Sequence, residues 1–242
     1  MHDGTTNYRG EMPSFTGKKA FVLGGAFAGS VRELMLEAGF VAARSLIDAD
    51  VVVFTGGEDV DPSLYGEKPH RTTYFTTSRD AYEKQVYETC LKDKKFMFGI
   101  CRGAQFLHVM NGGSLWQNVE GHGGRSHLIV DLEDDVRVSA TSIHHQMLKD
   151  NNRLVVLAVT EEQISKRFES GTMSVTLRSD TSFEKEIEAG LYPETGCFFV
   201  QGHPEVGEDA YRAWTMNKLK DCLVDFESSV GENTPLEIPL TQ

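Results

Sequence analysis

The amino-acid sequence predicts an α/β fold with a doubly wound, mostly parallel sheet. Strand and helix patterns alternate through the first half of the chain, which is typical of parallel strands joined by helices. The strand pattern at 51–54 is apolar without alternation, as expected for a strand that helices cover on both faces. A third pattern, at 96–105, runs from an apolar strand through a cysteine directly into an amphipathic helix, which predicts a nucleophile elbow.

The first predicted unit is a buried strand at 18–25 that ends in glycines, followed by a helix that Ser30 is placed to cap. The loop at 24–29 between them lacks the Lys-Ser/Thr pair of a P-loop, so a tight turn is favoured over a phosphate cradle. The next predicted elements are a short strand at 41–45, the strand at 51–54, a helix at 78–94 with Tyr82, Val86, Cys90 and Leu91 on its apolar stripe, the central strand at 96–100, and a helix closed by Gly112 and Gly113.

The periodicity changes after residue 113. Short alternating runs predict antiparallel strands added to the sheet, at 128–132, 136–138, 154–159 and 174–177. A last apolar strand at 197–201 leads into Gly202-His203-Pro204-Glu205, and a helix is expected from about Glu208.

We expect one domain at 18–228, with a flexible N-terminal arm at 1–17 and an extended C-terminal tail at 229–242. The net charge of −12 and the lack of a basic cluster argue against direct nucleic-acid binding. No apolar run reaches the roughly 18 residues of a membrane span. The first residues show no signal peptide, so a cytoplasmic protein without membrane contact is expected. The four cysteines lack CxxC pairing, which favours reduced thiols.

Cys101 is the predicted nucleophile. Side chains at Gly99 or Gly103 would collide with the neighbouring strand and helix at such an elbow, whereas a merely buried cysteine, the alternative, does not require flanking glycines. The N-terminus of the following helix favours a thiolate, and the Arg102 N–H is placed to hold a developing oxyanion. The loop after the strand at 51–54 would lie beside the elbow, so Gly57 is a second oxyanion donor or, alternatively, part of a plain turn.

A cysteine nucleophile needs a base and a group that orients it. His203 follows an apolar strand, and Glu205 is two residues away, so these two are the predicted base and orienting carboxylate. His144 and His145 are the rival pair, and as neighbours on a strand they are expected to point in different directions. His108, inside a helix, is expected to be packed or half-buried.

His122 and His127 flank a glycine-rich loop without a carboxylate or cysteine at ligand spacing. We expect both at the surface and expect no metal site. The predicted chemistry needs no organic cofactor either.

Six motifs in chain order resemble the class I glutamine amidotransferase superfamily, and most closely its gamma-glutamyl hydrolase branch, the peptidase C26 group. They cover much of residues 18–226 and read GGEDVDPSLYGE (56–67), RDAYE (79–83), FGICRGAQ (98–105), GGSLWQ (112–117), SIHHQ (142–146) and QGHPE (201–205). The sequence departs from the usual pattern at Thr55, where proline is usual, and at Gly202, where an aromatic residue is usual before the histidine.

The resemblance implies a flavodoxin-like sheet and a Cys101-His203-Glu205 triad. It also implies an oxyanion hole from the backbone of Gly57 and Arg102. Gln105 is the implied glutamyl-binding residue, and His145 and Gln146 of the SIHHQ motif are further candidates for substrate binding.

Three functions remain open at this stage. In the first, glutamine or another gamma-glutamyl compound is cleaved and ammonia passes to a separate synthetase or transferase subunit. In the second, the chain is a stand-alone hydrolase of a gamma-glutamyl amine or peptide. In the third, it is a catalytically silent binding relative, which the intact cysteine, histidine and glutamate disfavour. The oligomeric state is left open.

Overall fold

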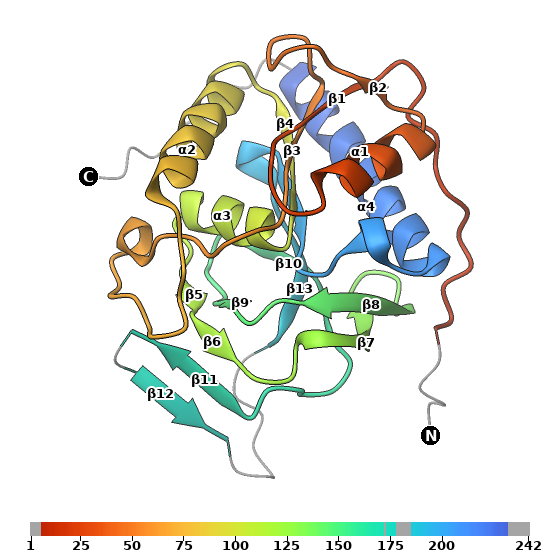
Figure 1. Cartoon of the computed structure of the whole chain (residues 1–242). Coiled ribbons are helices and arrows are strands. Elements are labelled where there is room, and N and C mark those ends of the chain that lie inside the picture. Colours follow the sequence, from red (N-terminus) through yellow and green to blue (C-terminus); the bar gives the residue numbers. More distant parts are fainter. Residues whose placement is uncertain (1–5, 172, 178–184, 232–242) are drawn as a thin grey trace.

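A nine-stranded sheet with helices on both faces forms the centre of the protein (Figure 1). The computed structural model describes residues 6–171, 173–177 and 185–231. Helices α2 and α3 cover one face of the sheet, and α1 and α4 cover the other (Figure 1). The four helices are α1 (Ala28–Glu37), α2 (Thr77–Lys92), α3 (Arg102–Met110) and α4 (Asp209–Gly231). The predicted doubly wound α/β fold is therefore confirmed.

The sheet has the strand order β2-β1-β3-β4-β14-β13-β10-β7-β8. The first five of these strands are parallel, and their order follows the flavodoxin-like pattern. The last four are antiparallel additions. The strands of this sheet are β1 (Lys19–Val22), β2 (Val41–Ala42), β3 (Val51–Phe54), β4 (Phe96–Ile100), β7 (Gly123–Asp131), β8 (Arg137–Ile143), β10 (Val155–Thr160), β13 (Ile187–Tyr192) and β14 (Cys197–Val200).

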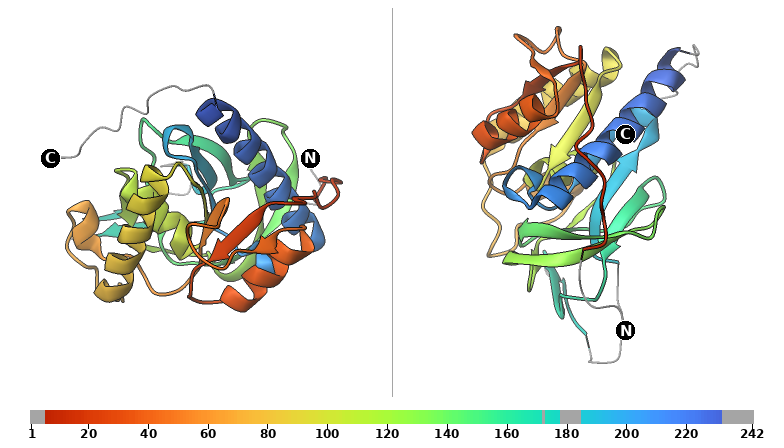
Figure 2. Two further views of the ribbon diagram at one scale, coloured as in Figure 1. Left: turned by 90° about the horizontal axis from the view of Figure 1, so that it is seen from above. Right: turned by 90° about the vertical axis from the view of Figure 1, so that its right-hand side faces the viewer.

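Two small sheets lie beside the large one. One has the order β12-β11-β6 and the other pairs β5 with β9. Strands β7, β8, β11 and β12 gather at one end of the molecule, beneath the helices (Figure 1, Figure 2). The small strands are β5 (Leu115–Trp116), β6 (Asn118–Val119), β9 (Met147–Leu148), β11 (Arg167–Ser170) and β12 (Met173–Thr176), and short 3-10 turns cover 62–65, 193–195 and 204–206.

The uninterrupted apolar pattern of the central strands follows from their burial on both faces. Every residue of β3, β4 and β14 is buried. Because successive side chains of a strand alternate between faces, Val51 and Val53 pack in the core that includes α1 and α4. Val52 and Phe54 pack on the opposite side, with α2 and α3. The registers align the carboxyl ends of β3, β4 and β14 at one edge of the sheet.

Two local predictions about the helices are wrong. Ser30 lies inside α1, whose N-cap is Phe27 in a left-handed backbone conformation. Tyr82 is 52% exposed rather than part of the buried stripe of α2. Asp80 and Glu83 are buried instead, because both pair with the guanidinium of Arg102 on α3.

The chain ends also differ from the predicted arm and tail. Residues 6–17 contain no helix or strand, but Phe15 is buried and stacks on Phe40 with ring centroids 4.2 Å apart. This part of the predicted arm is packed against the domain. Helix α4 continues through Gly231, so 229–231 are helical, and the rest of the predicted tail lies outside the described residues. None of the described helices is both long and apolar enough for a membrane span.

Candidate active site

Cys101 sits at a strained turn between β4 and α3. Its backbone angles are φ 54° and ψ −110°, a region that residues with side chains seldom occupy. A Cβ atom on Gly99 would lie 2.8 Å from the Ala104 nitrogen, and one on Gly103 would collide with the Phe54 carbonyl group of β3. The close approach of strand and helix thus requires glycine at both positions, which is the reason that the elbow prediction gave for them.

Loops from separate strands meet at Cys101. A Cβ atom placed on Gly56, in the loop after β3, would lie 3.1 Å from His203 Cε1 and 3.8 Å from Cys101 Cβ. The loop after β1 joins the group, because Ala26 forms a bridge with Gly56. The carboxyl ends of four parallel strands therefore supply this site, which is where open α/β sheets place their ligand sites.

His203 and Glu205 form a buried pair behind the cysteine. His203 Nδ1 is 2.6 Å from Glu205 Oε1, which leaves Nε2 as the other ring nitrogen. Burial by itself lowers the pKa of His203, but the hydrogen bonds with Cys101 and Glu205 outweigh it and raise this pKa to about 10. The imidazolium is thus the favoured form of the His203 ring at neutral pH, with the sulfur on one side and the carboxylate on the other.

Gly57 follows the bridge residue Gly56 and has a φ of 145°, which only glycine adopts readily. The carbonyl oxygen of Gly56 accepts from the Ala26 N–H at 3.0 Å and from Arg79 Nη2 at 3.0 Å. That carbonyl and the Gly57 N–H belong to one trans peptide, so they point in opposite directions. Arg79 and Ala26 on the carbonyl side therefore fix the direction of the Gly57 N–H.

Arg102 contributes its backbone to the site and its side chain to the interior. As the first residue of α3, it has an N–H with no acceptor inside the helix. Its guanidinium is buried, binds Asp80 and Glu83 of α2, and lies over the Phe106 ring at 4.9 Å. Burial and the nearby Arg79 lower the pKa of Arg102 to about 9. The ion pairs anchor the start of α3 against α2.

The predicted substrate-binding residues occupy two environments. Gln105 is buried in α3 with its side-chain nitrogen 3.4 Å from the Gln146 carbonyl oxygen. The Gln146 side-chain amide is also buried, and neither its nitrogen nor its oxygen has a hydrogen-bond partner within the described part of the chain. His145 has a side chain 42% exposed and pairs with Asp59 at 3.0 Å, and this hydrogen bond raises the pKa of His145.

The predicted burial is confirmed for some of the other histidines and wrong for two of them. His144 is buried while His145 is not, so the neighbours do point apart, and His108 is fully buried with Nδ1 2.8 Å from the Tyr192 hydroxyl. The prediction that His122 and His127 are surface residues is wrong. His122 is fully buried and His127 is partly buried, because both face acidic side chains of the strand region at 186–188.

Sequence reasoning assigned no role to two residues at this site. Arg79 belongs to the RDAYE motif, but its contact with the Gly56 carbonyl depends on the packing of α2 against the loop after β3. Phe27 packs edge-on against His203, with ring centroids 5.2 Å apart, and is partly exposed. An aromatic residue in a glycine-rich loop at the end of β1 was the available signal. Phe27 brings an aromatic ring to the histidine although Gly202 carries none.

A flavodoxin-like sheet whose central strand ends in an elbow cysteine beside a histidine–glutamate pair defines the class I glutamine amidotransferase-like superfamily. The structure is similar to a crystal structure of a glutamine amidotransferase from Thermotoga maritima, with a TM-score of 0.53 and 17% identity over 90% of this chain and 86% of that one. This likeness supports the fold. The chain belongs to the peptidase C26 family, which it matches over residues 34–205.

Two curated relatives agree with this membership. The YvdE homolog of Lactococcus lactis subsp. cremoris, named as a glutamine amidotransferase-like protein, is 35% identical over 121 residues, which are 42% of this chain and 64% of that protein. The gamma-glutamyl-CDP-amidate hydrolase of Campylobacter jejuni is 40% identical over 79 residues, 32% of this chain and 35% of that protein. The matched stretch spans less than two thirds of either relative.

Proposed function

We propose that this protein hydrolyses the amide bond of a gamma-glutamyl compound through a thioester on Cys101. The observation that carries the proposal is the meeting of Cys101, His203 and the Gly56–Gly57 loop, where one added carbon on Gly56 would touch both side chains. Membership of the peptidase C26 family supports amide hydrolysis as the reaction class.

The chemistry follows from the roles of these groups. The Cys101 sulfur attacks the side-chain carbonyl carbon of the gamma-glutamyl group, while His203 holds the thiol proton on Nε2 and Glu205 stabilises the imidazolium through Nδ1. The N–H groups of Gly57 and Arg102 hold the oxyanion, and removal of one such donor typically costs about 3 kcal/mol of barrier. His203 then protonates the departing ammonia or amine. Water attacks the thioester, and glutamate leaves.

Gln105, His145 and Gln146 are the proposed contacts for the glutamyl part of the substrate. Gln146 offers a buried amide donor and acceptor that no described residue uses. His145 pairs with Asp59, this hydrogen bond raises the pKa of His145, and its side chain stays 42% exposed and open to a ligand. These assignments rest on the position of the three residues in the fold and on the family resemblance.

Two forms of the function differ in the fate of the leaving group. In the first, ammonia released from glutamine passes to a separate synthetase or transferase subunit, and the relative named as glutamine amidotransferase-like favours it. In the second, the chain alone hydrolyses a gamma-glutamyl amine or amidate, and the gamma-glutamyl-CDP-amidate hydrolase relative favours it. Both use the same Cys101 thioester.

The deciding experiment measures glutamate released by the purified chain from L-glutamine and from a panel of gamma-glutamyl amines, peptides and amidates. Cys101→Ala serves as the blank. Fast turnover of one gamma-glutamyl compound, with glutamine a poor substrate, indicates the stand-alone hydrolase. Slow turnover of every compound, with Cys101 still labelled by a glutamine-like electrophile, indicates a subunit that needs its partner. The absence of both turnover and labelling would refute the proposal.

A further inference from the structure

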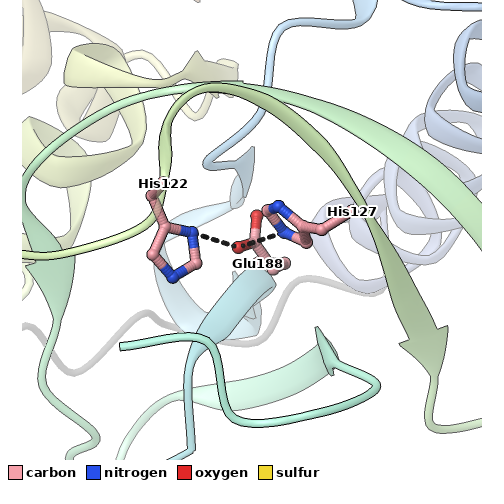
Figure 3. A group of neighbouring side chains, drawn as sticks. All are labelled: His122, His127 and Glu188. Atoms are coloured by element: carbon pink, nitrogen blue, oxygen red, sulfur yellow. Dashed lines mark hydrogen bonds and ion pairs between the residues drawn. The ribbon is translucent and has the colours of Figure 1, made fainter. Parts of the chain in front are cut away.

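We infer that His122, His127, His144 and Glu188 form a binding site for a divalent transition-metal ion, with zinc the best match. The four side chains come from different segments: the loop before β7, β7 itself, the loop after β8, and β13. Figure 3 shows the rings of His122 and His127 pointing at one oxygen of Glu188 from two sides. This inference is independent of the proposed hydrolase function.

The spacing of the donor atoms fits a tetrahedral ion. The distances from Glu188 Oε1 are 3.4 Å to His122 Nδ1, 2.9 Å to His127 Nε2 and 3.8 Å to His144 Nε2. With zinc–ligand bonds of about 2.0–2.1 Å, neighbouring donors in a tetrahedron lie about 3.4 Å apart. The donor atoms of His122, His127 and Glu188 also lie within 4.8 Å of one another. These three donors therefore form the compact part of the site, and His144 would complete it by moving its Nε2, now 3.8 Å from Glu188 Oε1, toward them.

In the His122 and His144 rings, one nitrogen is hydrogen-bonded to an oxygen away from Glu188, and the other, called here the inner nitrogen, faces Glu188 and carries no proton. His144 Nδ1 is 2.8 Å from the Gln146 carbonyl oxygen, which can only accept, so the proton lies on Nδ1 and Nε2 carries a lone pair. His122 Nε2 is 3.0 Å from Glu186 Oε1, which likewise leaves a lone pair on Nδ1. Neither inner nitrogen has a hydrogen-bond partner among the described residues, and both face a carboxylate.

Two lone pairs facing a carboxylate repel one another unless a cation lies between them. His127 Nε2, 2.9 Å from Glu188 Oε1, can donate one proton to the carboxylate. Protons on the ring nitrogens of His122 and His144 that face Glu188 would make imidazolium ions of two buried rings that are stacked with centroids 4.6 Å apart and would repel one another. One divalent ion instead accepts both lone pairs and the Glu188 oxygen together.

A second carboxylate, that of Glu186, holds the outer ring nitrogen of His122. Glu186 accepts from His122 Nε2 and from the backbone N–H groups of Ile164 and Ser165, at 2.6 and 2.7 Å. A carboxylate on the outer ring nitrogen fixes the tautomer and orientation of a histidine ligand. Glu186 is therefore a positioning residue rather than a ligand.

Four protein donors would close the coordination sphere, which is typical of a structural ion. Glu188 also lies beside the strand that leads to the candidate base, because its carbonyl oxygen accepts from the Gln201 N–H at 2.8 Å. The ion would thus join β7, β13 and the loop after β8.

The test uses the full chain carrying Cys101→Ala, so that the thiol cannot bind the metal. After treatment with a chelator and removal of the chelator, the protein is titrated with ZnCl₂, and bound zinc is measured by mass spectrometry after free metal is removed. We expect one zinc per chain and a higher Tm. In the same protein, Co²⁺ should give the strong visible absorption of four-coordinate cobalt. No bound zinc, or the weak spectrum of six-coordinate cobalt, would overturn the inference.

Variants locate the ion. His127→Asn and Glu188→Gln should each weaken zinc binding by about 100-fold or more, and Glu186→Gln by about 10-fold to 100-fold. The matched control is His70→Asn, because the His70 and His127 side chains are both 11% exposed and each faces a glutamate. Unchanged zinc affinity in His127→Asn would refute this site. If Glu188→Gln does not fold, His127→Asn and the cobalt spectrum still decide.

Discussion

Arg79 Nη2 donates to the Gly56 carbonyl oxygen at 3.0 Å, and this contact orients the peptide whose N–H belongs to Gly57. The same nitrogen also donates to the Thr55 carbonyl oxygen at 3.0 Å, and Arg79 Nε binds Glu83 at 2.8 Å. The guanidinium thus ties helix α2 to two successive peptides of the loop after β3. Lysine has no planar fork and cannot make these contacts together.

Arg79→Lys should therefore lower kcat by about 10²-fold, approaching the loss typical of one oxyanion donor, with a smaller effect on KM. Steady-state glutamate release measures the effect on the best substrate found. An unchanged kcat would show that the Gly57 N–H is not oriented by Arg79. The matched control is Arg71→Lys, a change of the same chemistry outside this contact.

Cys101→Ala should abolish glutamate release, with a loss of about 10⁴-fold or more, because no thioester can form. The alanine still fits the elbow, so the circular dichroism spectrum and the Tm should stay close to those of the unchanged chain. Full activity in this variant would refute the nucleophile assignment. Loss of labelling by a glutamine-like electrophile in the same protein supplies a second readout.

The sequence could predict the part of this site that is encoded locally. A cysteine between two spaced glycines, and a histidine just past an apolar strand, locate Cys101 and His203 because parallel strands present their carboxyl ends at one edge. Contacts between distant segments could not be predicted in this way. His122 lies 64 residues from Glu186, and Asp80 lies 22 residues from Arg102, so their burial depends on partners that only the tertiary fold brings together.

Strand β13 illustrates the same limit. Its sequence places Glu188 among small and apolar residues, and an isolated glutamate in such a run gives no sign that three histidines face it. The placement of Tyr82 on the buried stripe of α2 is wrong for a related reason, because ion pairs with Arg102 turn Asp80 and Glu83 inward and leave Tyr82 exposed. Hydrophobic periodicity cannot predict a buried face whose polar groups are paired.

His203→Ala should lower kcat/KM by about 10²-fold to 10⁴-fold, because the base that holds the thiol proton is lost. His145→Ala should cost less, since the His145 ring is tied to Asp59 and is partly exposed. Both variants are compared on one substrate under one set of conditions. Equal losses would show that His145, rather than His203 alone, takes part in proton transfer.

The raised pKa of His203 predicts a pH-dependent stability. Its pKa is about 10 in the folded chain against 6.5 for a free imidazole, so protonation favours the folded state. This contribution is present in full below pH 6.5 and is lost as the pH rises toward 10. The Tm difference between the unchanged chain and His203→Gln should therefore shrink over that range. A difference independent of pH would contradict the raised pKa.

Gly103→Ala should destabilise the protein by about 1–3 kcal/mol, because the added methyl group meets the Phe54 carbonyl group and must push α3 away from β3. The same displacement moves the Arg102 N–H, so activity should fall together with stability. Gly29→Ala is the matched control: it is also a helical glycine, with nothing within 4 Å of the new carbon, and alanine favours a helix by about 1 kcal/mol. Urea unfolding of both variants, beside their glutamate release, measures the difference. Equal stability of the two variants would mean that the close contact between Gly103 and the Phe54 carbonyl group does not hold α3 in place against β3.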